Sequence, residues 1–167
     1  MRERDWEVLS RITRAGARWK TWRVTRTLAA GPVPEHMAFS ADEKTLYVAN
    51  PPAGTVSAVS VAKGNVVKTF AVGANLHGID IGDDGQTLFV SSQKNDLLVA
   101  LDPATGAQRK LTLAPAPYHL NTIRGTGKVY VSSRKEPKIW VVDQKTLQLI
   151  GTIALPAGEG HQMVTVK

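Results

Sequence analysis

The chain contains four histidines, His36, His77, His119 and His161, which recur at spacings of 41, 42 and 42 residues. Imidazole is the commonest protein ligand for transition metals, and it also ligates haem iron. A group of histidines at one place therefore predicts a site for a metal, a haem-like macrocycle or an anionic ligand. Because the interval is long and regular, such a site depends on a repeated structural unit that brings the four side chains together.

Three further residues are candidates for a ligand site. Asp80 is predicted to lie in an inner strand where the other repeats carry Ala38 and Thr122, so the repeat itself does not require a carboxylate there. Arg124 and Arg134 follow predicted strands and could face a channel or a rim. The alternative for Asp80 is a buried carboxylate bonded to turn amides, and for the two arginines it is a solvated loop position.

The sequence contains none of the short motifs that place a nucleophile, a base or a phosphate-binding loop. It has no Gly-x-Ser-x-Gly, no His-Glu-x-x-His and no dinucleotide fingerprint. It also has no cysteine, which excludes disulfides and thiolate metal sites. With no catalytic group assigned by any motif, we predict a non-catalytic protein.

Three consecutive units of 42 residues make up most of the chain, at 31–72, 73–114 and 115–156, and a further unit begins at 157–167. The repeat is clearest in the segments "TLYVAN", "TLFVSS" and "KVYVSS". Each unit has four short segments rich in Val, Ile, Leu and Thr, separated by turns that carry Asp and Gly. No stretch from residue 31 onward has helical periodicity, so the predicted fold class is all-β.

Four antiparallel strands in about 42 residues are typical of a β-propeller blade. Blades stack radially, so the alternate apolar side chains of each repeated strand should pack between neighbouring blades. Because propellers close with about four to eight blades, we predict a partial propeller within 27–167, or a half-ring that a homodimer completes. A closed four-blade monomer is the alternative; residues 24–31 resemble a fourth strand, but the repeat phase breaks upstream of them.

Residues 1–26 form a basic tail that contains Trp6, Trp19 and Trp22. Residues 1–27 carry eight Lys or Arg and three Asp or Glu, a net charge of +5, whereas the remaining residues carry 13 and 11, a net charge of +2. Stacking of these tryptophans on single-stranded nucleic acid is one interpretation, but we do not expect a nucleic-acid partner. The tail lacks the apolar core of a secretory signal, and the chain has no apolar run long enough for a membrane-spanning helix.

The tetrapeptide YVAN at 47–50, with looser copies at 89–92 and 130–133, resembles the signature of the YVTN-type β-propeller repeat proteins of bacteria and archaea. The turns "SADEKT" and "GDDGQT" and the Asp-Pro-x-Thr-Gly turn at 102–106 are also similar to that family, and the resemblance covers about residues 27–166. It implies a surface-layer or periplasmic protein, and therefore a periplasmic or extracellular location. Similar repeats also occur in cofactor-bearing propeller enzymes. The chain differs from the family in lacking a signal peptide and in being short.

On a propeller, each histidine would precede the innermost strand of its blade, close to the mouth of the central channel. We expect the four imidazoles to lie on a wide ring, too far apart to share one small ion. Adjacent pairs, or a large flat cofactor, could use them. The alternative is a structural histidine that forms hydrogen bonds within its own blade, as in WD-repeat propellers.

The function predicted from these observations is a binding or interaction scaffold, with a protein or small ligand at the rim or channel mouth. The alternative is a fragment of a periplasmic propeller enzyme or cofactor carrier, in which the histidines hold a haem-like cofactor or a metal. A third interpretation is a truncated product without a function of its own. The sequence identifies neither the ligand nor a cofactor.

Overall fold

The computed structural model describes residues 26–161 and 163, and these residues form twelve β-strands. The strands build three four-stranded antiparallel sheets, each from a consecutive block of sequence. Blade 1 contains β1 (Met37–Phe39), β2 (Thr45–Asn50), β3 (Thr55–Ser60) and β4 (Asn65–Ala71). Blade 2 contains β5 (Leu76–Ile81), β6 (Leu88–Ser92), β7 (Leu97–Leu101) and β8 (Gln108–Thr112). Blade 3 contains β9 (Pro117–Ile123), β10 (Lys128–Ser133), β11 (Lys138–Asp143) and β12 (Leu149–Ala154).

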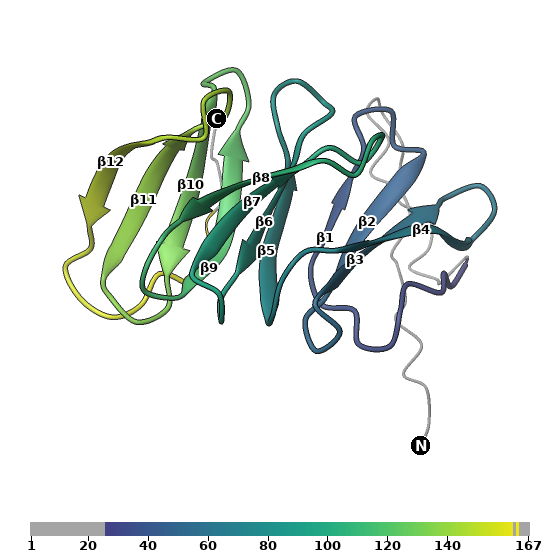
Figure 1. Ribbon diagram of the computed structural model, residues 1–167, viewed down its shortest axis with the longest axis horizontal. Coiled ribbons are helices and arrows are strands. Elements are labelled where there is room, and N and C mark those ends of the chain that lie inside the picture. Colours follow the sequence, from purple (N-terminus) through teal and green to yellow (C-terminus); the bar gives the residue numbers. More distant parts are fainter. Residues whose placement is uncertain (1–25, 162, 164–167) are drawn as a thin grey trace, which may run out of the picture.

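The three blades stand side by side in chain order, with blade 2 between the other two (Figure 1). Each blade is a meander whose first strand is innermost, and the inner strands β1, β5 and β9 contact one another from blade to blade. This arrangement confirms the predicted all-β fold of four-stranded blades and a partial propeller.

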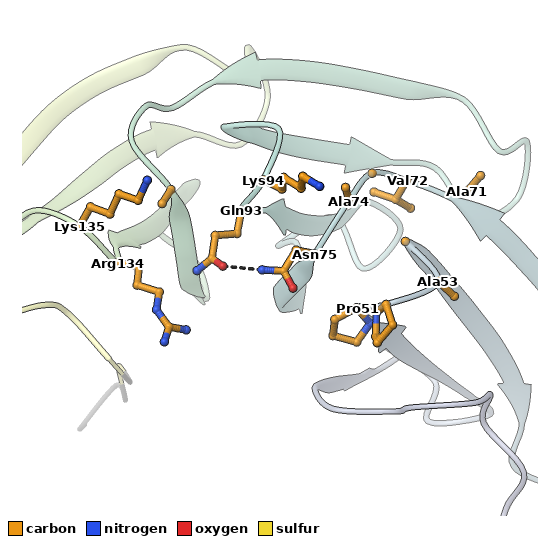
Figure 2. A pocket seen from close by; sticks show the side chains of 14 residues that line it. Pro51, Ala53, Ala71, Val72, Ala74, Asn75, Gln93, Lys94, Arg134 and Lys135 are labelled. Carbon is orange, nitrogen blue, oxygen red and sulfur yellow. Dashed lines mark hydrogen bonds between the residues drawn. The ribbon is translucent and has the colours of Figure 1, made fainter. Parts of the chain in front are cut away.

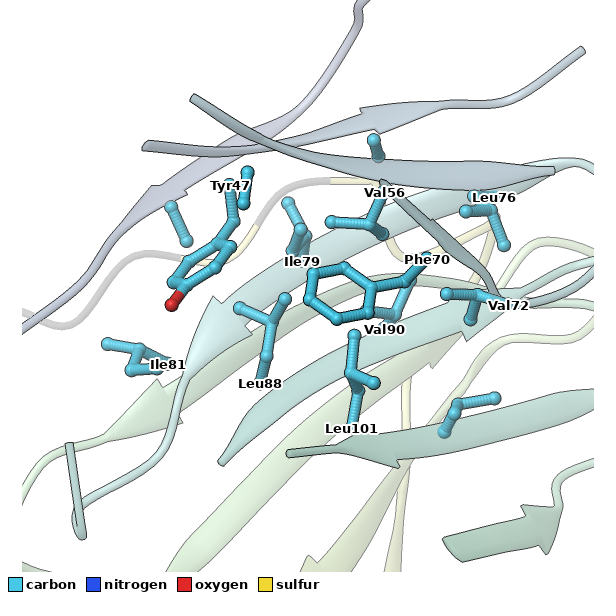
Figure 3. Close-up of a cluster of buried hydrophobic side chains, with 14 residues drawn as sticks. Tyr47, Val56, Phe70, Val72, Leu76, Ile79, Ile81, Leu88, Val90 and Leu101 are labelled. Carbon is cyan, nitrogen blue, oxygen red and sulfur yellow. The ribbon is translucent and has the colours of Figure 1, made fainter. Parts of the chain in front are cut away.

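Alternate residues of each second strand face opposite sides of the blade, as the two-residue period of a strand requires. In β2, Tyr47 and Ala49 pack in the layer between blades 1 and 2, whereas Leu46 and Val48 pack on the other face of blade 1. Figure 3 shows the first of these layers, where the ring of Phe70 lies among aliphatic side chains from both blades.

The expectation that the repeated strand packs between blades on both faces is confirmed for β6, where Leu88 and Val90 face blade 1 and Phe89 faces blade 3. Among the described blades, the strand β2 contributes to one inter-blade layer only.

The layer between blades 2 and 3 is built in the same way. Phe89 of β6 is fully buried there, together with Leu98 of the same blade and Val129, Val131 and Trp140 of blade 3. Since a lone four-stranded sheet cannot bury both of its faces, these two layers are what hold the three blades together.

The face of blade 1 that points away from blade 2 is partly covered by residues that precede the first strand. Leu28 and Ala30 are buried against Leu46 of that face, although residues 26–30 form no strand. They precede Phe70 and Val72 of the next layer by 42 residues, one full repeat. The described part of the segment 24–31 therefore buries the same residues as a fourth strand would, but it does not pair as a strand.

Two sequence predictions fall largely outside the described residues. Of the basic tail at 1–26, only Arg26 is described, and its Nη1 donates a hydrogen bond to the carbonyl oxygen of Val61 at 2.7 Å. Within the predicted strand at 157–167, the described residues 157–161 and 163 form no strand. Across the part of the chain that the structure describes, no helix has the length and apolar character needed to cross a membrane.

Candidate functional site

The inner strands β5 and β9 each contain an irregularity at the position of the repeated histidine. In β5 the register with β6 shifts between Leu76 and Ile79, and His77 lies within this interval. In β9 the register with β10 shifts in the same way at the segment that contains His119. A β-bulge of this kind redirects side chains that a regular strand would send into an inter-blade layer. The irregular segments therefore position both histidines beside the innermost edge of the blades.

Three of the four histidines lie in direct contact. The Nε2 atoms of His36 and His77 are 3.1 Å apart, and those of His77 and His119 are 3.2 Å apart. One ligand nitrogen from each of the three lies within 4.8 Å of the others. The expectation of a wide ring, too far apart to share one small ion, is therefore wrong for these three. The reason is that the blades converge at their inner strands, and the irregular segments turn the imidazoles toward one another.

His161 lies beside this group but is not part of it. Its ring is exposed, with its centroid 4.5 Å from that of His119 and 5.5 Å from that of Tyr118. The rings of His36, His77 and His119 have centroids only 4.2 to 5.0 Å apart. These contacts leave no space between the three rings for a flat macrocycle, so a haem-like cofactor would need the group to open. The observed histidine contacts also join different blades, unlike the within-blade hydrogen bonds of the structural alternative.

Burial and neighbouring positive charge keep the histidines of this group in their neutral form. Burial lowers the pKa of His77 to about 3 and that of His119 to about 4, and the other imidazoles and Arg134 act in the same direction. The pKa of His36 is also lowered by burial, although the carboxylate of Glu35 opposes the change. Neutral imidazoles retain the lone pairs that a metal or a hydrogen-bond donor requires.

These pKa values predict that the metal-free chain loses stability as the pH falls below about 6.5. An unfolded histidine takes up its proton near pH 6.5, whereas folded His77 does so near pH 3. Between these values the unfolded state binds more protons, so lowering the pH reduces the free energy of unfolding. We expect a loss on the order of 1–3 kcal/mol, because partial solvent exposure reduces the full linkage of about 1.4 kcal/mol per pKa unit.

Urea unfolding in EDTA, between pH 7 and about 4.5, checks this expectation, since most carboxylates stay ionised over that interval. A His77→Gln, His119→Gln double variant should show a flatter stability profile than the wild type. An equal slope in the two proteins would contradict the assignment of this pH dependence to the histidines.

Asp80 joins blade 2 to blade 3. Its Oδ2 accepts hydrogen bonds from the backbone N–H and the hydroxyl of Thr122, at 2.8 and 2.6 Å. Its Oδ1 accepts one from the N–H of Ile81 at 2.8 Å. Thr122 is the residue one repeat further on, so the non-repeated carboxylate bonds the equivalent position of the next blade. These contacts agree with a structural role for Asp80, but the carboxylate is half-buried and bonds residues of β5 and β9 instead of the turn amides that were expected.

The two candidate arginines have different surroundings. Arg124 is exposed in the turn after β9, beyond the opposite end of that strand from His119. Arg134 is also exposed, but its guanidinium lies over the ring of Tyr118, 4.7 Å from the ring centroid. That ring stacks on His77, with centroids 3.9 Å apart and planes inclined by 14°. The structure thus brings Arg134, but not Arg124, next to the histidine group.

Arg134 also lines a cleft with a volume of about 980 Å³, formed by hairpin turns of blades 1, 2 and 3 and by the segments that connect the blades. Figure 2 shows Arg134 and Lys135 on one side of this cleft, Pro51 on the other, and Asn75 and Gln93 between them. Asn75 Nδ2 donates a hydrogen bond to Gln93 Oε1 at 2.5 Å. The buried Gln93 Nε2 makes no hydrogen bond to any described residue. The described lining of the cleft includes three basic side chains and no acidic one.

Several residues of this region were not singled out from the sequence. Tyr118 and Glu35 each directly precede a repeated histidine. Neither residue type recurs before the other histidines, so the repeat pattern did not mark them. Gln93 and Lys94 lie in a hairpin turn of blade 2, and Lys135 lies in the matching turn of blade 3. Only the stacking of the blades brings these turns to one cleft, so sequence spacing by itself could not have identified it.

The radial stack of four-stranded blades, with histidines and loop residues at its inner end, defines this chain as part of a β-propeller. No protein-family model and no curated protein matches the chain. Among solved structures, it is similar to hydrazine synthase from Kuenenia stuttgartiensis, with a TM-score of 0.71 and 20% identity over 83% of this chain and 40% of that one. The WD40 repeats of RRP9 match with a TM-score of 0.71 and 15% identity over 80% of this chain and 42% of that one.

A putative 6-phosphogluconolactonase from Bacteroides fragilis also matches, with a TM-score of 0.63 and 22% identity over 77% of this chain and 42% of that one. The chain thus spans about two fifths of the length of these structures. At such low identity, the similarity establishes the β-propeller fold.

Proposed function

We propose that this chain is part of a YVTN-type β-propeller that acts as a non-catalytic binding scaffold. Its ligand-binding surface is the cleft that Arg134 lines, and its ligand is a small anionic molecule. The observation that supports this proposal best is the composition of the cleft. Lys94, Arg134 and Lys135 line it together with the polar side chains of Asn75 and Gln93, and its described lining has no carboxylate.

The cleft has the properties expected of a small-molecule site. Its volume of about 980 Å³ lies at the upper end of the usual range for ligand pockets, and such sites combine apolar walls with a few convergent polar groups. The walls here include Pro51 and Val72. Arg134 can offer a planar pair of N–H donors to a carboxylate or phosphate, a geometry that lysine lacks.

The YVTN resemblance supports a periplasmic or extracellular location as part of this proposal. The alternative, a propeller enzyme or cofactor carrier that uses the channel-mouth histidines, is favoured by the contact between His36, His77 and His119. No group in the described cleft acts as a nucleophile paired with a base, so the scaffold is the simpler proposal.

Neutralising Arg134 should weaken anion binding by about tenfold, which corresponds to about 1.4 kcal/mol. The measurement is isothermal titration calorimetry of the full chain with inorganic phosphate and with succinate, using glycerol as the neutral comparison. Arg134→Gln removes the charge that faces the cleft, whereas Lys63→Gln removes one from an exposed turn of blade 1 that does not line it. Equal binding by the two variants, or no binding by the wild type, would contradict the proposal.

We further propose that a second copy of the chain completes the ring. The outer strand β12 of blade 3 leaves Leu149, Ile150 and Ile153 about half exposed, at 48, 53 and 46%. At the place of Ile153, blades 1 and 2 have Phe70 and Leu111, and both pack in an inter-blade layer. Light scattering of the purified chain should therefore give twice the mass of one chain. A monodisperse monomer would contradict this assembly without affecting the proposed cleft.

A further inference from the structure

We propose that His36, His77 and His119 together bind one divalent transition-metal ion, with zinc as the expected metal. The three residues come from three consecutive blades, and one ligand nitrogen of each lies within 4.8 Å of the other two. None of them lines the cleft described above, so this site is additional to the proposed anion site.

The distances between the nitrogens are those of ligands that share a metal. Zinc–imidazole bonds are about 2.0–2.1 Å long, so tetrahedral ligands stand about 3.3 Å apart. The Nε2 atoms of His36 and His77 are 3.1 Å apart, and those of His77 and His119 are 3.2 Å apart. The third pair must approach to the same distance of about 3.3 Å. Since all three nitrogens lie within 4.8 Å of one another, side-chain shifts of at most about 1.5 Å in total bring the third nitrogen to this distance.

Hydrogen bonding alone does not satisfy this arrangement. Each ring nitrogen of a neutral imidazole has either one proton or one lone pair. His77 Nε2 faces a histidine nitrogen on both sides. Its single proton or lone pair can form a good hydrogen bond to only one of them, so the other contact remains without a full hydrogen bond. A metal ion instead accepts a lone pair from all three nitrogens at once.

The surroundings of His77 fit those of a metal ligand. Glu35 Oε2 lies 3.5 Å from His77 Nδ1, and ligating histidines commonly direct their second nitrogen at a carboxylate. That approach favours the proton on Nδ1, which leaves the Nε2 lone pair directed at the other two histidines. Tyr118 stacks on the same imidazole and limits its rotation. His119 is only 6% exposed, so its ring orientation is also restricted.

The identity of the ligands indicates the class of metal. Imidazole nitrogens suit zinc, copper and nickel, whereas calcium and magnesium prefer oxygen ligands. Three protein ligands leave a fourth position of a tetrahedral zinc ion for water or another small ligand. His161, which contacts His119 but lies outside the converging group, is not required.

Calorimetric titration of the full, EDTA-treated chain with zinc chloride tests this proposal. We expect one zinc ion per chain, and at least about a 30-fold loss of affinity in His77→Gln and in His119→Gln, since second-shell changes alone cost 10–100-fold. The matched control is His161→Gln, which removes a repeated histidine outside the group and should change affinity by less than about threefold. Equal losses in His161→Gln and His77→Gln would overturn the assignment to these three histidines.

A measurement on the wild-type chain covers the case in which a histidine variant does not fold. Cobalt(II) bound in place of zinc at a tetrahedral imidazole site absorbs visible light far more strongly than hydrated cobalt. Zinc should then displace cobalt and remove the band in a one-to-one ratio, and it should raise the midpoint of thermal unfolding. Absence of both the band and the thermal shift would overturn the proposal. Phosphate and succinate titrations test the cleft, whereas zinc titration tests the histidine group. Failure of one proposal therefore leaves the test of the other intact.

Discussion

Replacing Gly78 by alanine should lower the free energy of unfolding by about 3 kcal/mol or more, which makes it one of the most damaging single changes in the chain. A methyl group on Gly78 would lie 2.5 Å from the backbone nitrogen of Leu120 and 2.7 Å from the carbonyl oxygen of Tyr118. Both atoms belong to β9 of the next blade and cannot rotate away. The strand β9 would have to move, and it carries His119.

The same substitution should also disturb the histidine group. Gly78 directly follows His77, and its N–H donates a hydrogen bond to Ser91 Oγ at 2.8 Å. That hydroxyl in turn donates to the carbonyl oxygen of Tyr118. Separating β5 from β9 breaks this bridge and moves His77 away from His119. We therefore expect Gly78→Ala to weaken zinc binding as well as stability.

The matched control for this prediction is Gly151→Ala in β12. There the added methyl group would meet only Val141 Cβ, at 3.9 Å, and the backbone needs no positive φ. Alanine should be neutral or slightly stabilising at this position. Urea denaturation and zinc titration of both variants provide the comparison. Similar stability of Gly78→Ala and Gly151→Ala would show that the close approach of β5 and β9 is not required for the fold.

Removing the ring of Phe89 should cost about 3–5 kcal/mol, because a large buried side chain leaves a cavity that the surroundings fill only in part. Phe89 is fully buried in the layer between blades 2 and 3, where Trp140 and Val131 also lie. Phe89 lies in β6, a central strand of the blade 2 sheet, where it pairs with Asp80 of β5 on one side and with Ala100 of β7 on the other. The strand cannot collapse onto the cavity without separating these pairs.

Chemical denaturation of Phe89→Ala provides the measurement, and two further variants serve as controls for side-chain volume and for burial. Phe89→Leu keeps most of the volume and should cost less than about 2 kcal/mol. Phe39→Ala, at a phenylalanine that is 43% exposed in β1, should cost less than about 1 kcal/mol. A loss at Phe89 no larger than the loss at Phe39 would mean that blades 2 and 3 do not depend on this layer.

Much of the fold could be predicted because a strand's two-residue period and a 42-residue repeat are both visible along the chain. The alternation in the repeated second strand correctly predicted apolar side chains between blades, such as Tyr47 and Phe89. Each histidine was expected to precede its inner strand, but His77 and His119 lie within β5 and β9. The irregular register around these two residues hides the alternation that signals a strand.

The candidate site was predicted in part. The histidine interval correctly indicated that equivalent positions would meet, but the ring was expected to be wide. Spacing along the chain contains no information about the distance of a residue from the propeller axis. That distance depends on the close approach of β5 and β9 at Gly78, and on the direction in which an irregular strand turns its side chains. Arg134 was a candidate, but Tyr118, which joins it to His77, was not.

The sequence alone determined the all-β class, the four-strand blade and the equivalence of the histidines, because each depends on local strand propensity or on a period that one chain repeats. Three features became visible only in the folded chain: the contact of His36, His77 and His119, the hydrogen bonds between Asp80 and Thr122, and the basic cleft between segments of all three blades. These features arise from contacts between residues about 40 positions apart. They depend on how closely rigid blades can approach, which is set by backbone sterics and side-chain volume across the interface rather than by any local pattern.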